Sequence, residues 1–208
     1  CGPVGYKALL DPYAPVPVVE RRDGRFVLDF EGRPSSVGRL RSFQGNFGMM
    51  VRAYAYLREM GAEGLKQATE LAVLNANYLR ARLGELWHVP YDRVCMHEVV
   101  ISDRHLKESH VTTMDVAKRL MDYGFHPPTV YFPLVVKGAM LIEPTETESL
   151  QTLDEFVDVM KTISDEASGD PGIAKAAPQV TRLRRLDETQ AARKPVLRWT
   201  APETPSEP

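Results

Sequence analysis

The sequence predicts an α/β chain whose central part is a small α+β domain, a sheet with helices on one face. Three observations predict this fold class. Between residues 93 and 167 the strand and helix patterns follow the order β-α-β-β-α. A capping box at residues 112–115 marks the start of one helix, and apolar residues at helical spacing over 150–163 mark the buried face of another. The chain has 208 residues and is 43% hydrophobic, so it can bury the core that such a domain needs.

Residues 1–45 predict a connector, because they are rich in proline and have little apolar periodicity. A short helical turn is expected at 5–10. Residues 25–30 predict a strand, and Asp23-Gly24 before it predicts a hairpin turn. The chain opens on Cys1-Gly2-Pro3-Val4-Gly5 rather than on methionine. We interpret this opening as mid-protein sequence that lies on a body the chain does not contain.

Residues 46–92 predict two antiparallel helices joined by a short turn. The first helix begins at Asn46, a favourable N-cap residue. It ends near Gly61, because glycine readily adopts the left-handed conformation that stops a helix. The second helix runs from about residue 63 to residue 83. Its predicted buried stripe consists of residues that recur at helical spacing: Leu65, Ala68, Ala72, Asn75 and Leu79.

Residues 93–168 make up the predicted α+β domain. Strands are expected at 94–101, 129–136 and 139–142, and a helix from the capping box to Tyr123 is stopped by Gly124. Thr145-Glu146-Thr147-Glu148 is expected to cap the last helix. The predicted buried face of that helix comprises Leu150, Leu153, Phe156, Val157, Met160 and Ile163. Residues 169–208 are rich in proline and in charged residues, so we expect them to form a C-terminal extension with a frayed end.

Composition narrows the classes of partner. A formal charge of -2 gives no reason to expect nucleic acid or an anionic membrane. No apolar run approaches the roughly 20 residues of a membrane-spanning helix. Two cysteines do not make a disulfide framework, so we expect a reducing, cytoplasmic compartment. The one basic cluster, residues 182–186, is interpreted as solvated surface or, alternatively, as a docking patch for an acidic carrier protein.

The helix start at residues 42–48 is the first candidate site. Ser42-Phe43-Gln44-Gly45-Asn46-Phe47-Gly48 combines a serine, an asparagine and two glycines just where a helix begins. Free backbone N–H groups at such a start can bind a phosphate. The same residues also suit a plain N-cap without a ligand.

A metal site is not expected. His97-Glu98 falls in a predicted strand, where successive side chains point to opposite faces and cannot hold one ion together. His97 is therefore interpreted first as a packing residue. His88, His105 and His110 have no companions at ligand spacing.

The segment Glu143-Pro144-Thr145-Glu146 lies where the last strand passes into the last helix. A proline-shaped turn with a capping box accounts for these residues without a ligand.

Four segments of the chain form long motifs: Gly64-Leu65-Lys66-Gln67-Ala68-Thr69-Glu70, Leu74-Asn75-Ala76-Asn77-Tyr78-Leu79, Gly124-Phe125-His126-Pro127-Pro128-Thr129-Val130 and Glu143-Pro144-Thr145-Glu146-Thr147-Glu148. With these motifs the chain resembles the glycine dehydrogenase (decarboxylating) family, the pyridoxal-phosphate P-proteins of the glycine cleavage system. The resemblance covers nearly the whole chain and is to the C-terminal part of subunit 2 of the two-subunit bacterial form. Another pyridoxal-phosphate enzyme, such as a cysteine desulfurase, is disfavoured because the downstream motifs match the P-protein throughout.

The resemblance implies an aminotransferase-like (type I) fold and an enzyme that decarboxylates glycine and passes the aminomethyl group to the lipoyl arm of the H-protein. It places Gly45 and Asn46 at the phosphate of pyridoxal phosphate in a neighbouring subunit. Gln44 departs from the tyrosine usual in the family, which removes a ring contact. The cofactor lysine is expected upstream of Cys1, so no catalytic residue is expected in this chain.

The resemblance also implies that His97, Glu143 and Thr145 lie near the substrate, with a structural role between the domains as the alternative for His97. Related aminotransferase-like enzymes hold the substrate carboxylate with an arginine close to this point. Glu143 and Thr145 take those positions here, which predicts that the carboxylate is not clamped.

The expected partners are glycine dehydrogenase subunit 1, the lipoylated H-protein and glycine. We expect the isolated chain to be inactive, and the apolar face of the helix at 46–60 to lack its partner. The alternative is a non-catalytic interaction or regulatory domain that pairs with another P-protein chain. The missing initial methionine favours the enzyme fragment over this alternative.

Overall fold

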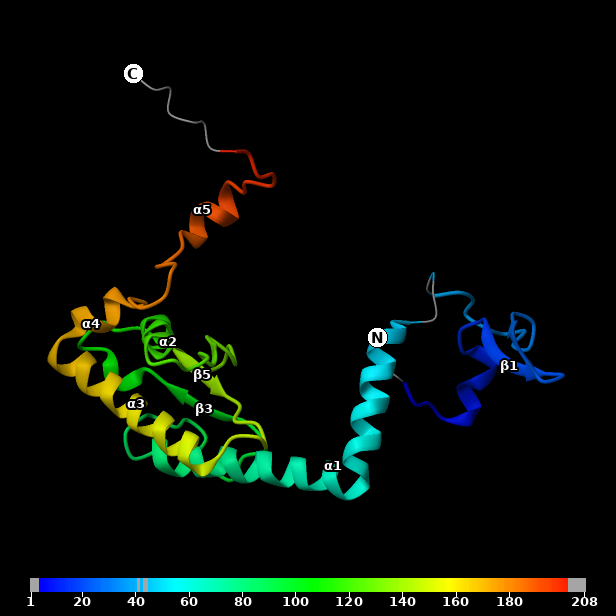
Figure 1. Ribbon diagram of the computed structural model, residues 1–208, viewed down its shortest axis with the longest axis horizontal. Helices are drawn as coiled ribbons and strands as arrows, with labels where there is room; N and C mark the ends of the chain where they lie inside the picture. The colour runs from blue at the N-terminus through cyan, green and yellow to red at the C-terminus, as the bar shows by residue number, and fades with distance from the viewer. Residues whose placement is uncertain (1–3, 41, 43–44, 202–208) are drawn as a thin grey trace. The chain divides into compact units, whose positions relative to one another are not determined.

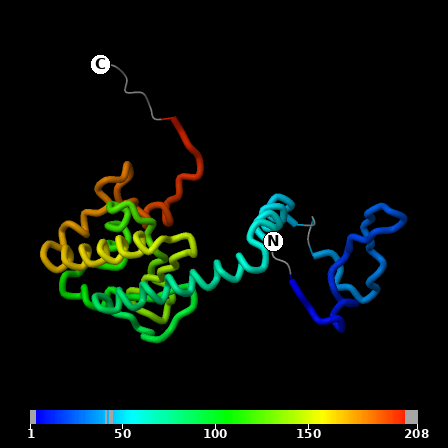
Figure 2. Tube along the Cα trace, turned by 60° about the horizontal axis from the view of Figure 1, so that its bottom comes forward, coloured from blue at the N-terminus to red at the C-terminus, as the bar shows by residue number. Residues whose placement is uncertain are grey.

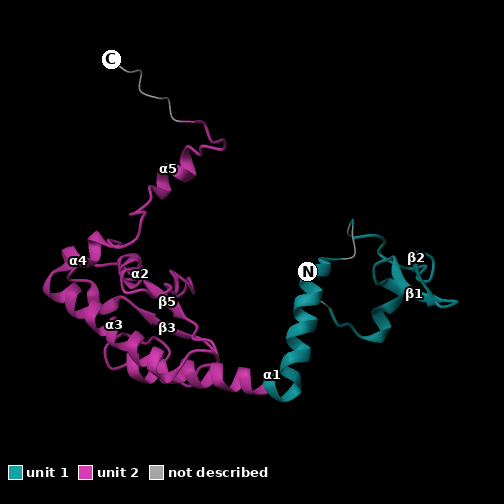
Figure 3. Ribbon diagram, viewed as in Figure 1, with its two compact units in different colours: residues 1–65 teal, residues 66–208 magenta. Residues whose placement is uncertain are grey.

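A computed structural model describes residues 4–40, 42 and 45–201. The chain divides into two compact units, residues 1–65 and 66–208 (Figure 3). The predictions for Gln44, for Cys1 and for the tail after residue 203 lie outside the described residues. The proposed division at residues 45, 92 and 168 stays a prediction.

The first unit contains a β-hairpin. Strands β1 (Val18–Arg22) and β2 (Arg25–Asp29) pair in antiparallel register, with Arg22 opposite Arg25. Asp23 and Gly24 between them have φ angles of 50° and 77°. Two positive φ angles are what a two-residue type I′ turn requires, so the predicted Asp-Gly turn is confirmed. The predicted helical turn lies slightly later, as the 3-10 helix η1 (Ala8–Tyr13).

Helix α1 (Phe47–Leu83) is two helical segments separated at Gly61. Gly61 has φ 60° and ψ −175°, a conformation that interrupts the helix and that glycine adopts without a Cβ clash. The predicted end of the first helix at Gly61 is therefore confirmed. The antiparallel placement of the two segments stays a prediction. On the first segment, large apolar side chains are exposed: Phe47 by 79%, Tyr54 by 65% and Leu57 by 52%.

The second unit contains an antiparallel sheet of three strands in the order β3-β5-β4 (Figure 1). The strands are β3 (Val99–Ser102), β4 (Thr129–Val130) and β5 (Ala139–Ile142). In chain order, the helices after β3 are η2 (Arg104–Leu106), α2 (Thr113–Asp122), α3 (Leu150–Gly169), α4 (Pro171–Ala176) and α5 (Glu188–Arg193). The predicted β-α-β-β-α order and the α+β class are confirmed. The second segment of α1 runs alongside α3 (Figures 1 and 2), where the Tyr78 hydroxyl donates to Asp154.

Helix α2 begins and ends as its sequence predicts. The Thr112 side chain accepts from the Asp115 backbone N–H, and the Asp115 carboxylate accepts from the Thr112 N–H at 2.8 Å. These two bonds are a capping box, which satisfies backbone donors that the first turn cannot. Gly124, with φ 82°, follows the helix end.

Three predictions about strand and helix limits are wrong. β3 begins at Val99 instead of residue 94, because the Cys95 backbone bonds to the Asn77 amide rather than to a strand. β4 ends at Val130, since Tyr131 has a φ of 56° and the nitrogen of Pro133, two residues later, cannot donate to a ladder. The N-cap of α3 is Ser149, whose side chain accepts from the Thr152 N–H at 3.1 Å, so the caps proposed at residues 145–148 are displaced.

One core gathers the sheet, α2, α3 and the second segment of α1. Leu79 and Leu83 bring α1 into this core, with exposed fractions of 1% and 0%. The predicted α3 face is buried except for Leu150, which is 61% exposed. The buried members on α3 are Leu153, Phe156, Val157, Met160 and Ile163.

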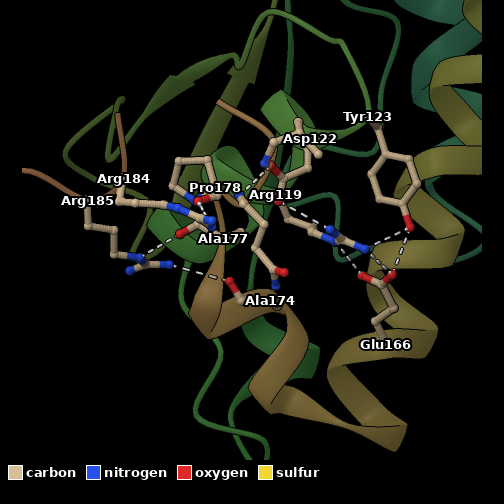
Figure 4. Close-up of polar contacts among 11 residues, drawn as sticks. Arg119, Asp122, Tyr123, Glu166, Ala174, Ala177, Pro178, Arg184 and Arg185 are labelled. Carbon is tan, nitrogen blue, oxygen red and sulfur yellow. Dashed lines mark hydrogen bonds and ion pairs between the residues drawn. The ribbon is translucent and has the colours of Figure 1, made fainter. Parts of the chain in front are cut away.

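A charged network joins α2 to α3 (Figure 4). The Arg119 guanidinium donates to both Glu166 oxygens, at 2.9 and 2.7 Å, and the Tyr123 hydroxyl donates to Glu166 at 2.7 Å. The Arg119 side chain also pairs with Asp122 at 3.2 Å. Asp122 in turn accepts the backbone N–H groups of residues 179 and 180. The network therefore fixes both helices and the chain after α4.

Two arginines of the basic cluster contact the chain itself (Figure 4). Arg185 donates to the Ala177 carbonyl at 2.7 Å and pairs with Asp115 at 2.7 Å. Arg184 donates to the Pro178 carbonyl at 3.1 Å. The cluster thus holds the segment after α4, and a docking role for it stays a prediction.

Gly138→Ala should destabilise the fold much more than Gly124→Ala. Both glycines have positive φ, 67° and 82°, which costs an L-residue about 1–2 kcal/mol. At Gly138 an added Cβ would also lie 1.9 Å from Asp103 Oδ1, whereas nothing lies within 4 Å at Gly124. Asp103 would have to move from Thr113, whose backbone N–H and hydroxyl donate to it at 3.1 and 2.9 Å. We expect unfolding free energies lower by about 3 kcal/mol for Gly138→Ala and about 1 kcal/mol for Gly124→Ala in urea titrations. Equal losses would contradict the close approach.

Low pH should remove the stabilisation that the ion pair between Arg119 and Glu166 contributes. The hydrogen bonds from Arg119 hold the pKa of Glu166 below its usual range. A carboxyl with a lowered folded pKa stabilises the fold fully above its unfolded pKa, about 4.3, and this contribution is lost as the pH falls through the folded pKa. Arg119→Met should lower the unfolding free energy by about 2–4 kcal/mol at pH 7, with a smaller difference from wild type at pH 3.

The control for this experiment is Arg182→Met, which removes the same charge from an exposed position. It should change the unfolding free energy by less than about 0.5 kcal/mol at either pH. A loss in Arg119→Met that is as large at pH 3 as at pH 7 would assign the effect to packing rather than to the ion pair.

Candidate functional site

A groove of about 620 Å³ lies in the second unit. Its walls are the loop at residues 124–129, the end of β5 with the segment after it, and the first half of α3. Leu79 of α1 and Glu98 complete it. Two of the sequence motifs, the Gly-Phe-His-Pro-Pro loop and the Glu-Pro-Thr segment, therefore meet in one concave surface.

The groove carries negative charge. Glu98, Glu143 and Glu148 line it, together with His126, while its floor includes Phe125, Leu153 and Phe156. Among the described residues, no lysine or arginine lines it. Such a surface attracts cations and repels carboxylates.

Three ligand-type side chains converge at one end of the groove. His97 Nε2 lies 3.7 Å from Glu98 Oε1 and 3.9 Å from Glu143 Oε1. The prediction that His97 and Glu98 point to opposite faces is wrong. Both residues precede β3, so the alternation of a strand does not apply to them.

Two asparagines of α1 hold the segments that present these side chains. The Asn77 amide N–H₂ donates to the Cys95 carbonyl at 2.8 Å, and its oxygen accepts the Cys95 N–H at 3.0 Å. The Asn75 amide donates to the Thr145 carbonyl at 2.9 Å. One turn of helix therefore anchors the chain on both sides of the site, before His97 and after Glu143.

Of the predicted site residues, Glu143 and Thr145 line the groove, and His97 lies beside Glu143. Thr145 lines the groove, and its hydroxyl lies 2.8 Å from the Thr147 hydroxyl. Gly45 and Asn46 belong to the first unit. Gly45 has a φ of 111°, and the Asn46 carbonyl accepts the N–H groups of Met49 and Met50, which opens α1. Their phosphate-binding role stays a prediction.

Asn75, Asn77, Glu98 and Glu148 were not identified as site residues from the sequence. Asn75 was assigned to the packing stripe of its helix, and the hydrogen-bonding role of Asn77 was not foreseen. Two asparagines at positions i and i+2 of one helix are the signal that could have indicated the roles of Asn75 and Asn77, because asparagine side chains readily bond to backbone groups.

The chemistry available in the groove is that of carboxylates, imidazoles and hydroxyls. Burial raises the pKa of the nearby Cys95 thiol, which disfavours the thiolate and so disfavours it as a nucleophile. The groove lining holds no lysine within the described residues. It therefore lacks the amine that would form a Schiff base with the aldehyde of pyridoxal phosphate. No helix in the described part of the chain has the length and apolar character to cross a membrane.

A second pocket, of about 820 Å³, lies near the start of α2 and is positively charged. Arg104, Lys107 and Lys137 line it. His88 joins this surface to β3, with its Nδ1 at 2.7 Å from the Ser102 hydroxyl.

Comparison with known proteins gives consistent matches. Residues 68–178 match the family described as glycine dehydrogenase, C-terminal domain. A protein described as probable glycine dehydrogenase (decarboxylating) subunit 2, from Caldanaerobacter subterraneus subsp. tengcongensis, is 56% identical over 199 residues, 96% of this chain and 41% of that protein. The protein of the same description from Bacillus velezensis is 54% identical over 198 residues, 95% of this chain and 40% of that protein. The chain thus spans about two fifths of the length of these relatives.

A solved structure shares the fold. It is the glycine decarboxylase (P-protein) of the glycine cleavage system in inhibitor-bound form, with a TM-score of 0.57 over 71% of this chain and 35% of that chain. Its sequence identity to this chain is 20%, so the likeness speaks for the fold alone.

Asn77→Ala should loosen the segment before β3 without unfolding the domain. Removal of the amide leaves the Cys95 N–H and carbonyl without partners, which costs about 1–3 kcal/mol. We expect amide hydrogen exchange at residues 95–98 to accelerate at least about tenfold, with the sheet still protected. Asn75→Ala is the matched control and should act instead on the segment around Thr145. Uniform acceleration across the domain in both variants would mean that the asparagines stabilise the fold but do not position the site.

Proposed function

The chain belongs to the glycine dehydrogenase C-terminal domain family, and from this premise we propose that it is the C-terminal part of a pyridoxal-phosphate enzyme that decarboxylates glycine. The complete enzyme would pass the remaining aminomethyl group to the lipoyl arm of an H-protein. The observation that carries the proposal is the groove, which is lined by Glu143 and Thr145 of one family-like motif and has His97 Nε2 beside it, 3.9 Å from Glu143 Oε1.

The charge of the groove supports a specific role in this reaction. Glu143 and Glu98 would repel a substrate carboxylate, and no cationic side chain of the described lining would hold it there. A carboxylate left unclamped is free to leave as CO2. The groove thus favours release of the group that a glycine decarboxylase must expel, and it departs from sites that retain the carboxylate with an arginine.

Cofactor binding by this chain is proposed only at the phosphate. Gly45, which lacks a side chain, and Asn46 at the start of α1 offer backbone N–H groups and an amide that suit phosphate oxygens. When bound, pyridoxal phosphate supplies the electron sink for decarboxylation. In line with the resemblance to the family, the lysine that would carry it is proposed to lie upstream of Cys1.

The described residues would then act by positioning. Asn75 and Asn77 fix the two segments of the groove, the Thr145 hydroxyl offers a hydrogen bond to a ligand, and the carboxylates set the potential. Glycine dehydrogenase subunit 1 and a lipoylated H-protein are the proposed partners, and a cytoplasmic location is part of the same proposal.

A second candidate is a non-catalytic module that pairs with another P-protein chain. The exposed apolar side chains of the first segment of α1, among them Phe47 and Tyr54, favour association with some partner. A scaffold role predicts that changes in the groove leave catalysis untouched.

The Glu143→Gln variant of the complete, cofactor-loaded enzyme distinguishes a part of the active enzyme from a non-catalytic module. If the groove acts on the substrate, we expect exchange of the glycine carboxyl with labelled bicarbonate to fall by roughly tenfold, which corresponds to about 1.4 kcal/mol. Glu146→Gln, three residues away and outside the groove lining, should stay within about twofold of wild type.

Unchanged glycine binding and exchange in Glu143→Gln would contradict the groove's role in catalysis and leave Glu143 a structural residue. A loss of equal size in both variants would point to the turn after β5 rather than to the Glu143 carboxylate. Thermal unfolding of each variant separates either result from misfolding.

A further inference from the structure

We propose that His97, Glu98 and Glu143 form a binding site for a divalent transition-metal ion such as Zn²⁺. The site lies beside the groove and shares Glu143 with the surface to which the glycine chemistry is assigned, but metal binding is a separate proposal with its own test. One imidazole nitrogen and two carboxylate oxygens are a donor set that zinc accepts.

The separation of the donor atoms suits a single ion. Two donors at about 2.0–2.2 Å from one metal ion are roughly 3 to 3.6 Å apart. His97 Nε2 lies 3.7 Å from Glu98 Oε1 and 3.9 Å from Glu143 Oε1, within a few tenths of an ångström of that separation. All three donor atoms lie within 4.8 Å of one another. The side chains are exposed by 53%, 38% and 58%, so small rotations can bring them to a metal ion.

The surroundings of the three donors favour a cation. Glu148 adds a further negative charge to the same groove, and no described lysine or arginine lines it to compete for the carboxylates. The Coulomb attraction of two carboxylates for a doubly charged ion therefore meets no opposing cation in the lining.

The chain also holds the backbone of the donors in place. Asn77 fixes Cys95, two residues before His97, through both backbone groups, and Asn75 fixes Thr145, two residues after Glu143. Glu98 directly precedes β3, which pairs with β5, and Glu143 directly follows β5. Val99 lies opposite Ile142 in this register, so the paired strands hold the two glutamates beside each other. Supports of this kind keep ligands close without the metal, which lowers the cost of ordering them on binding.

A metal ion here would change what the groove can bind. Three protein ligands leave at least one coordination position of zinc open toward water or a ligand. An oxygen or nitrogen donor of a neutral ligand could then bind at the open position.

The test is Zn²⁺ binding to the full chain after removal of metal with a chelator, measured by isothermal titration calorimetry. We expect one ion per chain. His97→Gln and Glu143→Gln should each weaken binding at least about tenfold, since loss of a ligand removes a metal–donor bond. Asn77→Ala should weaken it by a smaller factor, because it only loosens the segment before His97.

Glu148→Gln is the matched control. It removes the same charge from the same groove without removing a proposed ligand, so binding should change by less than about threefold. X-ray absorption of the zinc-loaded chain should show nitrogen and oxygen neighbours at about 2.0–2.2 Å, without sulfur. The multiple-scattering signal of a bound imidazole ring should be absent from the spectrum of His97→Gln.

Three results would overturn the proposal. One is the absence of binding at zinc concentrations up to about 1 mM, which corresponds to a binding free energy weaker than about 4 kcal/mol. A second is equal weakening by Glu148→Gln and Glu143→Gln, which would mean diffuse attraction to an acidic surface. The third is a stoichiometric ion that survives both ligand substitutions, which would place the metal elsewhere. Circular dichroism of each variant tests whether it is folded. We expect folded variants, because the His97 and Glu143 side chains are exposed.

Discussion

The hydrogen bonds from Asn75 and Asn77 are the constraint on which the site depends. A backbone group that leaves a regular strand or helix needs a partner, because an unpaired polar group shielded from water is costly. The segments before β3 and after β5 find theirs on one turn of α1, at the Cys95 N–H and carbonyl and at the Thr145 carbonyl. Burial of Ala76 and Leu79 on the same turn fixes that turn against the core.

An ion pair fixes α3 near its C-terminal end. Arg119 and Glu166 form a two-pronged ion pair that joins α2 to α3, and Asp122 accepts the backbone of the chain after α4. Arg185 adds a bond back to Asp115, which belongs to the capping box of α2. These bonds restrain the helix whose first half lines the groove. The contacts near the C-terminal end of α3 therefore help to hold one wall of the groove in place.

The two pockets of the second unit have opposite charge. The groove at Glu143 has three carboxylates in its lining, whereas the pocket near α2 has Arg104, Lys107 and Lys137. A net charge of -2 conceals this division, since the total says nothing of how the charges are distributed. The division matters for function, because an anionic substrate or partner and a cationic one would meet different surfaces of the same domain.

The sequence by itself determined the local structure and the family. Asp23-Gly24 dictates a hairpin turn, Gly61 ends a helix, and Thr112 with Asp115 caps α2, because these depend on backbone preferences of a few neighbouring residues. The motifs around Gly124 and Glu143 identified the family. Only the tertiary structure decided that His97, Glu98 and Glu143 face one point. Periodicity predicted a strand through residue 97, but the Cys95 backbone bonds to Asn77, 18 residues away, and a contact of that range leaves no mark on the local pattern.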